Sequence, residues 1–139
     1  MEKPQITNVI VLQTVLEEVK HLSLPIHKRV RDMIANKEKH FYVFSNEHHR
    51  ETFIEKLKDE SPNDRNDRAI RVATKWYGNH IKELKPHVSV VMMTDDAANR
   101  SKAIADGLQA VSGESWFMTI GYGKLHCGGE KYANIFSAL

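Results

Sequence analysis

Residues 63–77 read NDRNDRAIRVATKWY, a polar start followed by the pattern of an amphipathic helix. Pro62 precedes this run, and Ser61 or Asn63 can cap its first turn, which predicts a helix that begins here and ends near Lys85. Apolar side chains recur at spacings of three and four, the period of one helix face. The predicted buried stripe comprises Ile70, Ala73, Tyr77, Ile81 and Leu84.

Asp64 and Asp67 lie at different angles to this stripe. At about 100° of rotation per residue, Asp67 falls about 60° from the centre of the stripe and Asp64 about 120°. One interpretation is a solvated face with Asp64–Arg68 and Asp67–Arg71 pairs, which from spacing alone is the commoner arrangement. The other is that Asp67, at the edge of the core face, holds a metal ion at the end of the helix. The helix by itself leaves both open.

The composition is that of one globular domain. The chain has 139 residues, of which 41% are hydrophobic and 27% charged, enough for a domain with its own core. A net charge of +2 creates no strong global field, so any RNA would have to bind a local patch. The single cysteine, Cys127, excludes an internal disulfide. The sequence has no apolar run long enough to cross a bilayer and no signal-peptide pattern, so no membrane contact is expected.

Two short apolar runs predict strands that are buried on both faces. Residues 7–12 and 88–93 have almost no polar face, which is typical of a parallel sheet. Residues 40–44 and 108–111 suit further strands, and helices between them would give an α/β fold. The expected helices cover residues 15–22 with Thr14 as cap and Glu17 as capping-box partner, 26–36 after Pro25, and 97–106 before Gly107.

Further acids follow the two buried strands. Glu18 lies about 60° from the core face of its helix, and Asp95 and Asp96 stand at the carboxyl end of the second strand. One of Asp95 and Asp96 would cap the next helix, and the other would face the cleft. Ligands sit beyond the carboxyl ends of strands in open α/β sheets, and clustered carboxylates are tolerable mainly beside a cation. With Asp67, this pattern favours a Mg²⁺ or Mn²⁺ site that activates water to attack a phosphodiester.

A zinc site at His48 and His49 is not expected. Neighbouring histidines point to different sides of a helix or strand, and no Cys or His recurs at ligand spacing.

The composition changes at Gly113. The first 77 residues contain no glycine, whereas five of the seven glycines fall within residues 113–139. The residues Trp116, Met118, Ile120 and Tyr122 alternate with others, which could make a strand, and helix signals there are weak. We therefore divide the chain into a domain at 1–112 and a glycine-rich divergent tail at 113–139.

Three runs resemble one known family. They are NVIVLQTVLEEV at 8–19, KHFYVFSNEHHRET at 39–52 and NDRNDRAIRVA at 63–73. Together they look like the PIN (PilT N-terminus) endoribonuclease domain at the front of the RNA exosome's catalytic subunit, the Dis-three exonuclease with an RNase II-like body. The resemblance covers roughly residues 8–111. It implies a three-layer α/β/α fold with a central, mainly parallel sheet.

The resemblance also implies a function. In that family four acids at the carboxyl edge of the sheet hold Mn²⁺ or Mg²⁺, and the second, third and fourth correspond to Glu18, Asp67 and Asp96. These residues would be both metal ligands and catalytic residues, with Arg68 or Arg71 near the RNA phosphate. The implied partners are single-stranded RNA and RNA exosome core subunits, in RNA processing and decay. The implied location is the nucleus and nucleolus, with some protein in the cytoplasm.

The sequence departs from the family at two places. The family's first acid lies in an Asp-Thr-Asn motif on a central first strand, and no such motif precedes Val9. Asp95 stands where the family usually has asparagine. We therefore expect an N-terminally truncated member that lacks the first strand and first ligand and is impaired in cleavage. The alternatives are a catalytically inactive PIN-like module that binds the exosome or RNA, and an α/β domain of unrelated function.

Overall fold

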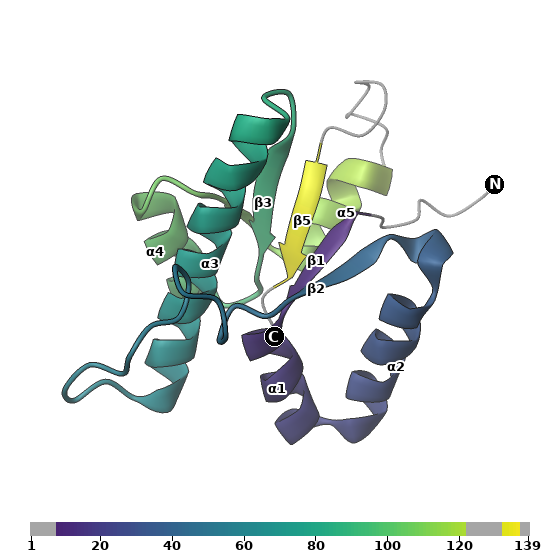
Figure 1. Cartoon of the computed structure of the whole chain (residues 1–139). Helices are drawn as coiled ribbons and strands as arrows, with labels where there is room; N and C mark the ends of the chain where they lie inside the picture. Colours follow the sequence, from purple (N-terminus) through teal and green to yellow (C-terminus); the bar gives the residue numbers. More distant parts are fainter. Residues whose placement is uncertain (1–7, 122–131, 137–139) are drawn as a thin grey trace.

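A five-stranded parallel sheet forms the centre of the fold (Figure 1). The structure is a computed structural model that describes residues 8–121 and 132–136. The strands are β1 (Val9–Leu12), β2 (Phe41–Phe44), β3 (Ser89–Met93), β4 (Gln109–Val111) and β5 (Tyr132–Phe136). Their order across the sheet is β2-β1-β5-β3-β4. The expected α/β class and parallel sheet are confirmed.

The helices lie close to the expected ranges, except for one at residues 113–121 that was not expected. They are α1 (Gln13–Leu22), α2 (Leu24–Ala35), the short 3₁₀ helix η1 (Lys37–Lys39), α3 (Pro62–Leu84), α4 (Ala97–Ala105) and α5 (Gly113–Gly121). No helix in the described ranges is both long and apolar enough to span a bilayer.

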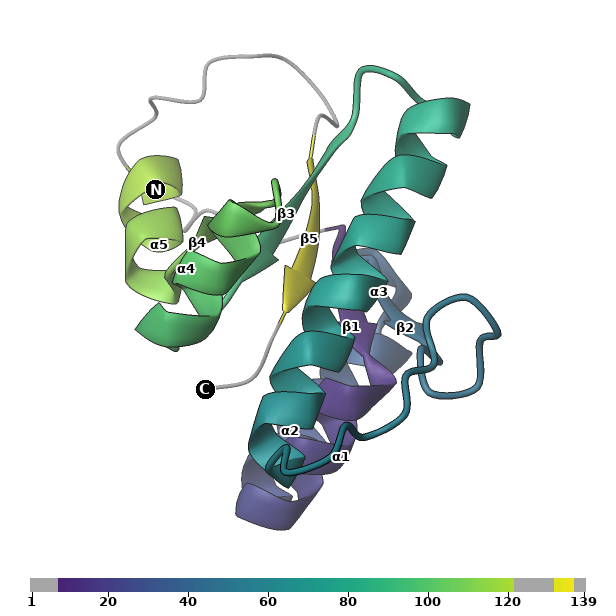
Figure 2. The same ribbon diagram turned by 90° about the vertical axis from the view of Figure 1, so that its left-hand side faces the viewer.

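Helices cover both faces of β3. Met92 packs in a core cluster with side chains of α3 and α4, whereas Val91 and Met93 contact Trp116 of α5. Alternate residues of a strand point to opposite faces, so this contact pattern places β3 in a middle layer. Figure 2 shows α3 and α5 on opposite sides of the strands. This arrangement is the expected three-layer α/β/α architecture.

The two buried runs became the expected inner strands. Every residue of β1 is buried, and Val9 and Leu12 are fully covered. The stripe predicted on α3 is buried through Ile70 and Ala73, but Leu84 is 67% exposed. Ser61 caps this helix through a hydrogen bond from the backbone N–H of Asp64.

The predicted cap of the first helix is wrong. The helix begins at Gln13, directly after β1, and its N-cap residue makes no side-chain capping bond. Thr14 instead donates through its hydroxyl to Glu47 and through its backbone N–H to the Asn46 side chain. Glu17 accepts from the Gln13 side chain at 2.9 Å rather than completing a capping box.

The strand expected from the alternation at Trp116 and Met118 is also wrong. These residues lie in α5, where the backbone N–H of Ser115 in the first turn donates to the hydroxyl of Ser112, just before the helix. Ile120 lies in the same helix, and Tyr122 lies outside the described residues. Burial of Trp116 against Met93 fits a helix on the sheet as well as a strand within it, and the short run does not distinguish the two.

The centre of the sheet is filled by β5 from the tail. This strand pairs with β1 from Val9 to Val11 and with β3 from Ser89 to Met93, parallel to both. In Figure 1 it lies between these two strands. The tail, expected to diverge from the domain, thus contributes a strand to the central sheet.

Candidate active site

The three predicted acids lie beyond the carboxyl ends of the parallel strands. Glu18 is in the second turn of α1, which follows β1, and Asp67 is in the second turn of α3. Asp96 caps α4 directly after β3. Since parallel strands end at a common edge, the chain brings acids from three separate segments to one side of the sheet.

Asn99 joins two of these acids. Its side-chain N–H donates to Asp67 Oδ1 at 2.9 Å, and its backbone N–H donates to Asp96 Oδ1 at 2.8 Å. Asn99 is only 1% exposed, so both bonds are shielded from water. The same residue therefore sets the positions of Asp67 and Asp96 relative to each other.

Arg71 and Arg68, the predicted RNA contacts, are both engaged within the protein. Arg71 donates to the Asn99 side-chain oxygen at 2.6 Å and to Asp106 at 3.2 Å. Arg68 forms a paired interaction with Glu60 at 2.8 Å. The alternative of Asp64–Arg68 and Asp67–Arg71 salt bridges is thus wrong, because these guanidinium groups pair with acids outside their own helix.

The acids repel one another electrostatically. Burial and the negative charges of Asp96 and Glu18 raise the pKa of Asp67 to about 6, against the opposing effect of Arg71 and Lys102. Burial also raises the pKa of Glu18, and the hydrogen bond from Asn66 opposes this rise. The potential at this edge is therefore negative, as a cation site requires.

The carboxylates nevertheless do not converge on one point. Within residues 8–121 and 132–136, no group of three or more His, Cys, Asp or Glu side chains could hold a metal ion as placed. Protein donors hold the acids instead: Asn66 donates to Glu18 at 2.8 Å, and Asn99 donates to Asp67. The donor chemistry suits Mg²⁺ or Mn²⁺, but three-ligand binding requires side-chain movement.

Asp95 and Asp96 have distinct roles. Asp96 is the cap of α4 and also acts on Asp67 through its charge. Asp95 is exposed and accepts a hydrogen bond from the backbone N–H of Gly113 at 2.9 Å, at the start of α5. Asp95, the acid that the cap argument left to face the cleft, therefore contacts the start of α5, whereas the capping acid Asp96 acts on Asp67.

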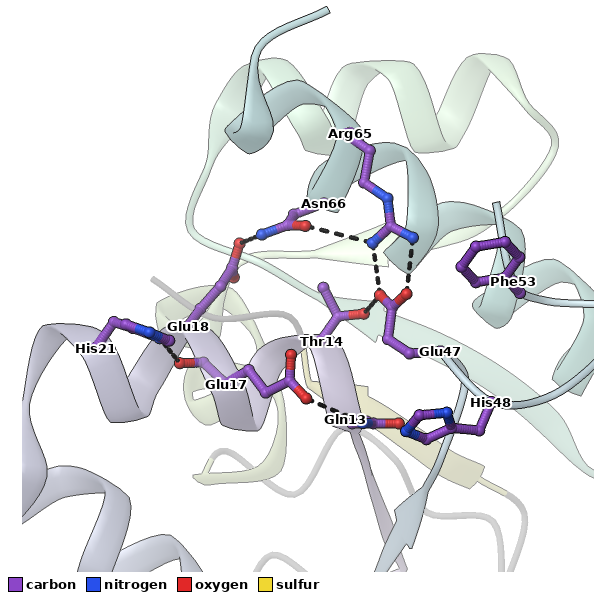
Figure 3. A pocket seen from close by; sticks show the side chains of 10 residues that line it. All are labelled: Gln13, Thr14, Glu17, Glu18, His21, Glu47, His48, Phe53, Arg65 and Asn66. Carbon is purple, nitrogen blue, oxygen red and sulfur yellow. Dashed lines mark hydrogen bonds and ion pairs between the residues drawn. The ribbon is translucent and has the colours of Figure 1, made fainter. Parts of the chain in front are cut away.

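A polar network next to the acids escaped the sequence reasoning. Asn46 is fully buried and exchanges hydrogen bonds with Thr14 through its side chain. Glu47 forms two bonds to the Arg65 guanidinium, at 2.6 and 2.7 Å, and these chiefly hold its pKa below the usual range. Figure 3 shows Thr14, Glu47 and Arg65 of this network beside Glu18. Its only sequence signal was the polar run after the strand at 40–44. The interpretation of that run concerned a zinc site at His48 and His49, not Asn46 and Glu47.

Known proteins share both the sequence and the fold of this chain. A family model described as "PIN domain" matches residues 1–114. The chain belongs to the PIN domain family.

Individual proteins are also similar to this chain. The chain is 51% identical over 122 residues to the human "Exosome complex exonuclease RRP44", a match that covers 86% of this chain and 13% of that protein. It is 38% identical to "Exosome complex exonuclease RRP44 homolog A" of Arabidopsis thaliana, over 90% of this chain and 13% of the relative. It is 44% identical to "Exosome complex exonuclease dis3" of Schizosaccharomyces pombe, over 73% of this chain and 10% of the relative. The PIN chain thus spans a small part of each relative.

A solved structure supports the same PIN fold. The "Structure of T. brucei RRP44 PIN domain" superposes with a TM-score of 0.71 at 26% identity, covering 86% of this chain and 71% of that one. The predicted likeness to the PIN domain of the exosome exonuclease is therefore confirmed. The fold described above is therefore a PIN-domain fold.

Proposed function

We propose that this PIN domain is a divalent-metal-dependent endoribonuclease that cuts single-stranded RNA in RNA processing and decay. The observation that carries the proposal is Asp67, whose pKa is raised to about 6 beside Asp96 and Glu18. The neighbouring negative charges make ionisation of Asp67 less favourable, and a bound cation would neutralise them. Glu18, Asp67 and Asp96 would hold Mn²⁺ or Mg²⁺.

The chain's own residues would position the reaction. The bound ion would supply an activated water and stabilise the leaving oxygen. Asn99 would keep Asp67 and Asp96 at a fixed separation, because it donates to both. Asn66 would hold the Glu18 carboxylate in the absence of the ion, and that hydrogen bond would break if the carboxylate turned to the ion. Glu18 would therefore have to exchange its hydrogen bond from Asn66 for the ion.

Arg68 and Arg71 are proposed to guide the RNA phosphate. Arg71 is the stronger candidate, because its guanidinium contacts Asn99 next to Asp67. A phosphate would compete with Asp106 for Arg71, or with Glu60 for Arg68. Asp106 is the more exposed of the two acids, with a side-chain exposure of 52% against 10% for Glu60, so its bond to Arg71 is the easier to exchange.

The proposed setting follows from the relatives. Several are described as exosome complex exonucleases, which supports RNA exosome core subunits as partners of this chain. On the same basis we propose a nuclear and nucleolar location with some protein in the cytoplasm. Co-purification of tagged chain with exosome core subunits would test the first point, and imaging of the tagged chain would test the second.

The test of cleavage is a circular single-stranded RNA, because a circle has no end for an exonuclease. With Mn²⁺ or Mg²⁺, the chain should linearise the circle, and Asp67→Asn should abolish this. Glu83→Gln, an exposed acid change near the end of α3, is the matched control and should cleave normally. Cleavage that survives Asp67→Asn would refute the assigned role of Asp67.

A second candidate function is an inactive binding module. One observation favours it: within the described ranges no three potential ligands are placed to hold an ion. Such a module would bind RNA or an exosome core subunit without cutting. Binding of single-stranded RNA that is unchanged by EDTA and by Asp67→Asn, with an uncut circle, would select this candidate.

A further inference from the structure

A pocket lies beside the acids, between α1, the loop after β2 and the start of α3 (Figure 3). Its volume of about 410 Å³ is in the range of small-molecule sites, about 300–1,000 Å³. Glu18 and Asn66 form part of its wall, and Asp67 follows Asn66 in the chain. An RNA phosphate placed at the acids would therefore bring a neighbouring nucleotide to this pocket.

The charge of the pocket selects against phosphate. Arg65 is the one arginine of the lining, and its guanidinium is committed to Glu47 at 2.6 Å. Glu17 and Glu18 remain as unbalanced acids on the same wall. An anionic group entering here would be repelled, whereas a neutral ring that carries N–H donors would be attracted.

The pocket is also rich in acceptors. Glu17 is an exposed pocket residue that accepts through Oε1 from the Gln13 side chain, and Figure 3 shows its carboxylate beside that side chain. The Gln13 side-chain oxygen is buried and has no donor within the described residues. Because an unmatched buried acceptor costs free energy, a ligand N–H that reaches Gln13 after a small rotation would be favoured.

An aromatic ring borders this polar wall. Phe53 is 52% exposed and lines the pocket, with Arg65 Cζ 5.9 Å from its ring centroid. Exposed aromatic rings are the usual stacking surface for unpaired bases of single-stranded RNA. The pocket thus pairs a stacking ring with carboxylate acceptors.

We propose that this pocket binds a guanine base of single-stranded RNA adjacent to the cleaved phosphate, an inference that rests on the proposed function. Guanine presents two neighbouring donors, N1–H and N2–H, which match the two oxygens of the Glu17 carboxylate. Uracil offers one N–H between two carbonyl oxygens, and a carboxylate repels those oxygens. Phe53 stacks on the base, and Glu17 selects it.

The test is a titration of the full chain with guanosine, inosine and uridine in EDTA, followed by backbone amide NMR. Nucleosides carry no phosphate and EDTA removes any ion, so binding of a phosphate at the metal does not contribute. Guanosine should shift the amides around Glu17, Glu47 and Arg65 and bind about fivefold more tightly than uridine, with inosine, which lacks the N2 amine, in between. Glu17→Gln should weaken guanosine about fivefold without weakening uridine, because the charge that repels the uracil carbonyl oxygens is removed.

Two further variants complete the test. Phe53→Ala should weaken both nucleosides, because it removes the stacking ring, and Glu83→Gln should change neither. Equal binding of guanosine and uridine, or an unchanged guanosine affinity in Glu17→Gln, would overturn the guanine pocket. Cleavage of circular RNA without this base preference would leave the proposed nuclease standing and refute the pocket. Guanosine selectivity without any metal-dependent cleavage would support the guanine pocket and refute the proposed nuclease.

Discussion

The Asn99 side chain donates to Asp67 Oδ1 at 2.9 Å, although 32 positions separate the two residues in the chain. Asn99 also receives a bond from Arg71 at 2.6 Å, so one buried amide links an acid to a base. Asn99 therefore connects α4 to α3 and also fixes the Asp67 side chain of the candidate site.

Replacing Asn99 by alanine should therefore destabilise the protein. The change removes the donor to Asp67 and leaves Arg71 without its closest acceptor, which should cost about 1–3 kcal/mol of unfolding free energy. Urea unfolding followed by circular dichroism measures this. Asn79→Ala on the exposed face of α3 is the control, and equal effects of the two changes would contradict the role given to Asn99.

Asp67→Asn should stabilise the metal-free protein at pH 7. The pKa of Asp67 is raised from 3.8 to about 6, so the folded state binds a proton more tightly than the unfolded state does. Stability from this group is therefore fully present below pH 3.8 and is lost as pH rises through about 6. Because Asp67 is only partly covered, the gain from the amide should be about 1 kcal/mol, smaller than the shift alone implies.

Melting temperatures of Asp67→Asn and the parent chain at pH 7 and pH 4, both in EDTA, would check this. The variant should melt higher at pH 7, and the difference should shrink at pH 4. A variant that melts lower at both values would show that the Asn99 bond to Asp67 outweighs the repulsion from Glu18 and Asp96.

Glu47→Gln should have the opposite dependence on pH. The bonds from Arg65 lower the pKa of Glu47, so the folded state releases its proton more readily than the unfolded state does. Stability from the Glu47–Arg65 pair is present above the ordinary glutamate pKa of 4.5 and is lost as pH falls through the lowered folded value. The variant should melt below the parent chain at pH 7 and approach it in strong acid. A difference that does not change with pH would assign the effect to packing alone.

The fold was largely predictable where one short stretch carries enough information. β1 and β3 are buried on both faces, and their continuous apolar runs predicted this directly. The start of α3 followed from Ser61 and Pro62, which act within one turn. That Glu18, Asp67 and Asp96 lie near one another followed from helical phase, strand ends and the family resemblance, and their role as metal ligands stays a prediction.

The features of the fold and the candidate site that were not predicted depend on contacts between residues far apart in the sequence. Thr14 is a suitable helix cap by type, but Asn46 and Glu47 bind it from another strand end. Asn99 carries no motif, and its importance comes from where α3 and α4 meet. The place of β5 between β1 and β3 is likewise a long-range pairing that no local pattern encodes.

The most direct test of the central claim is a Mn²⁺ titration of the purified chain, read as melting temperature. If Glu18, Asp67 and Asp96 hold an ion, Mn²⁺ at about a hundredfold above its dissociation constant should add about 2.7 kcal/mol of stability. The melting temperature should rise by about 10 °C, since each kcal/mol is worth roughly 4 °C in a domain of this size. Asp67→Asn should show no rise, while Glu83→Gln should respond as the parent chain does. A cooperative melt that Mn²⁺ leaves unchanged, or an equal rise in Asp67→Asn, would contradict the account.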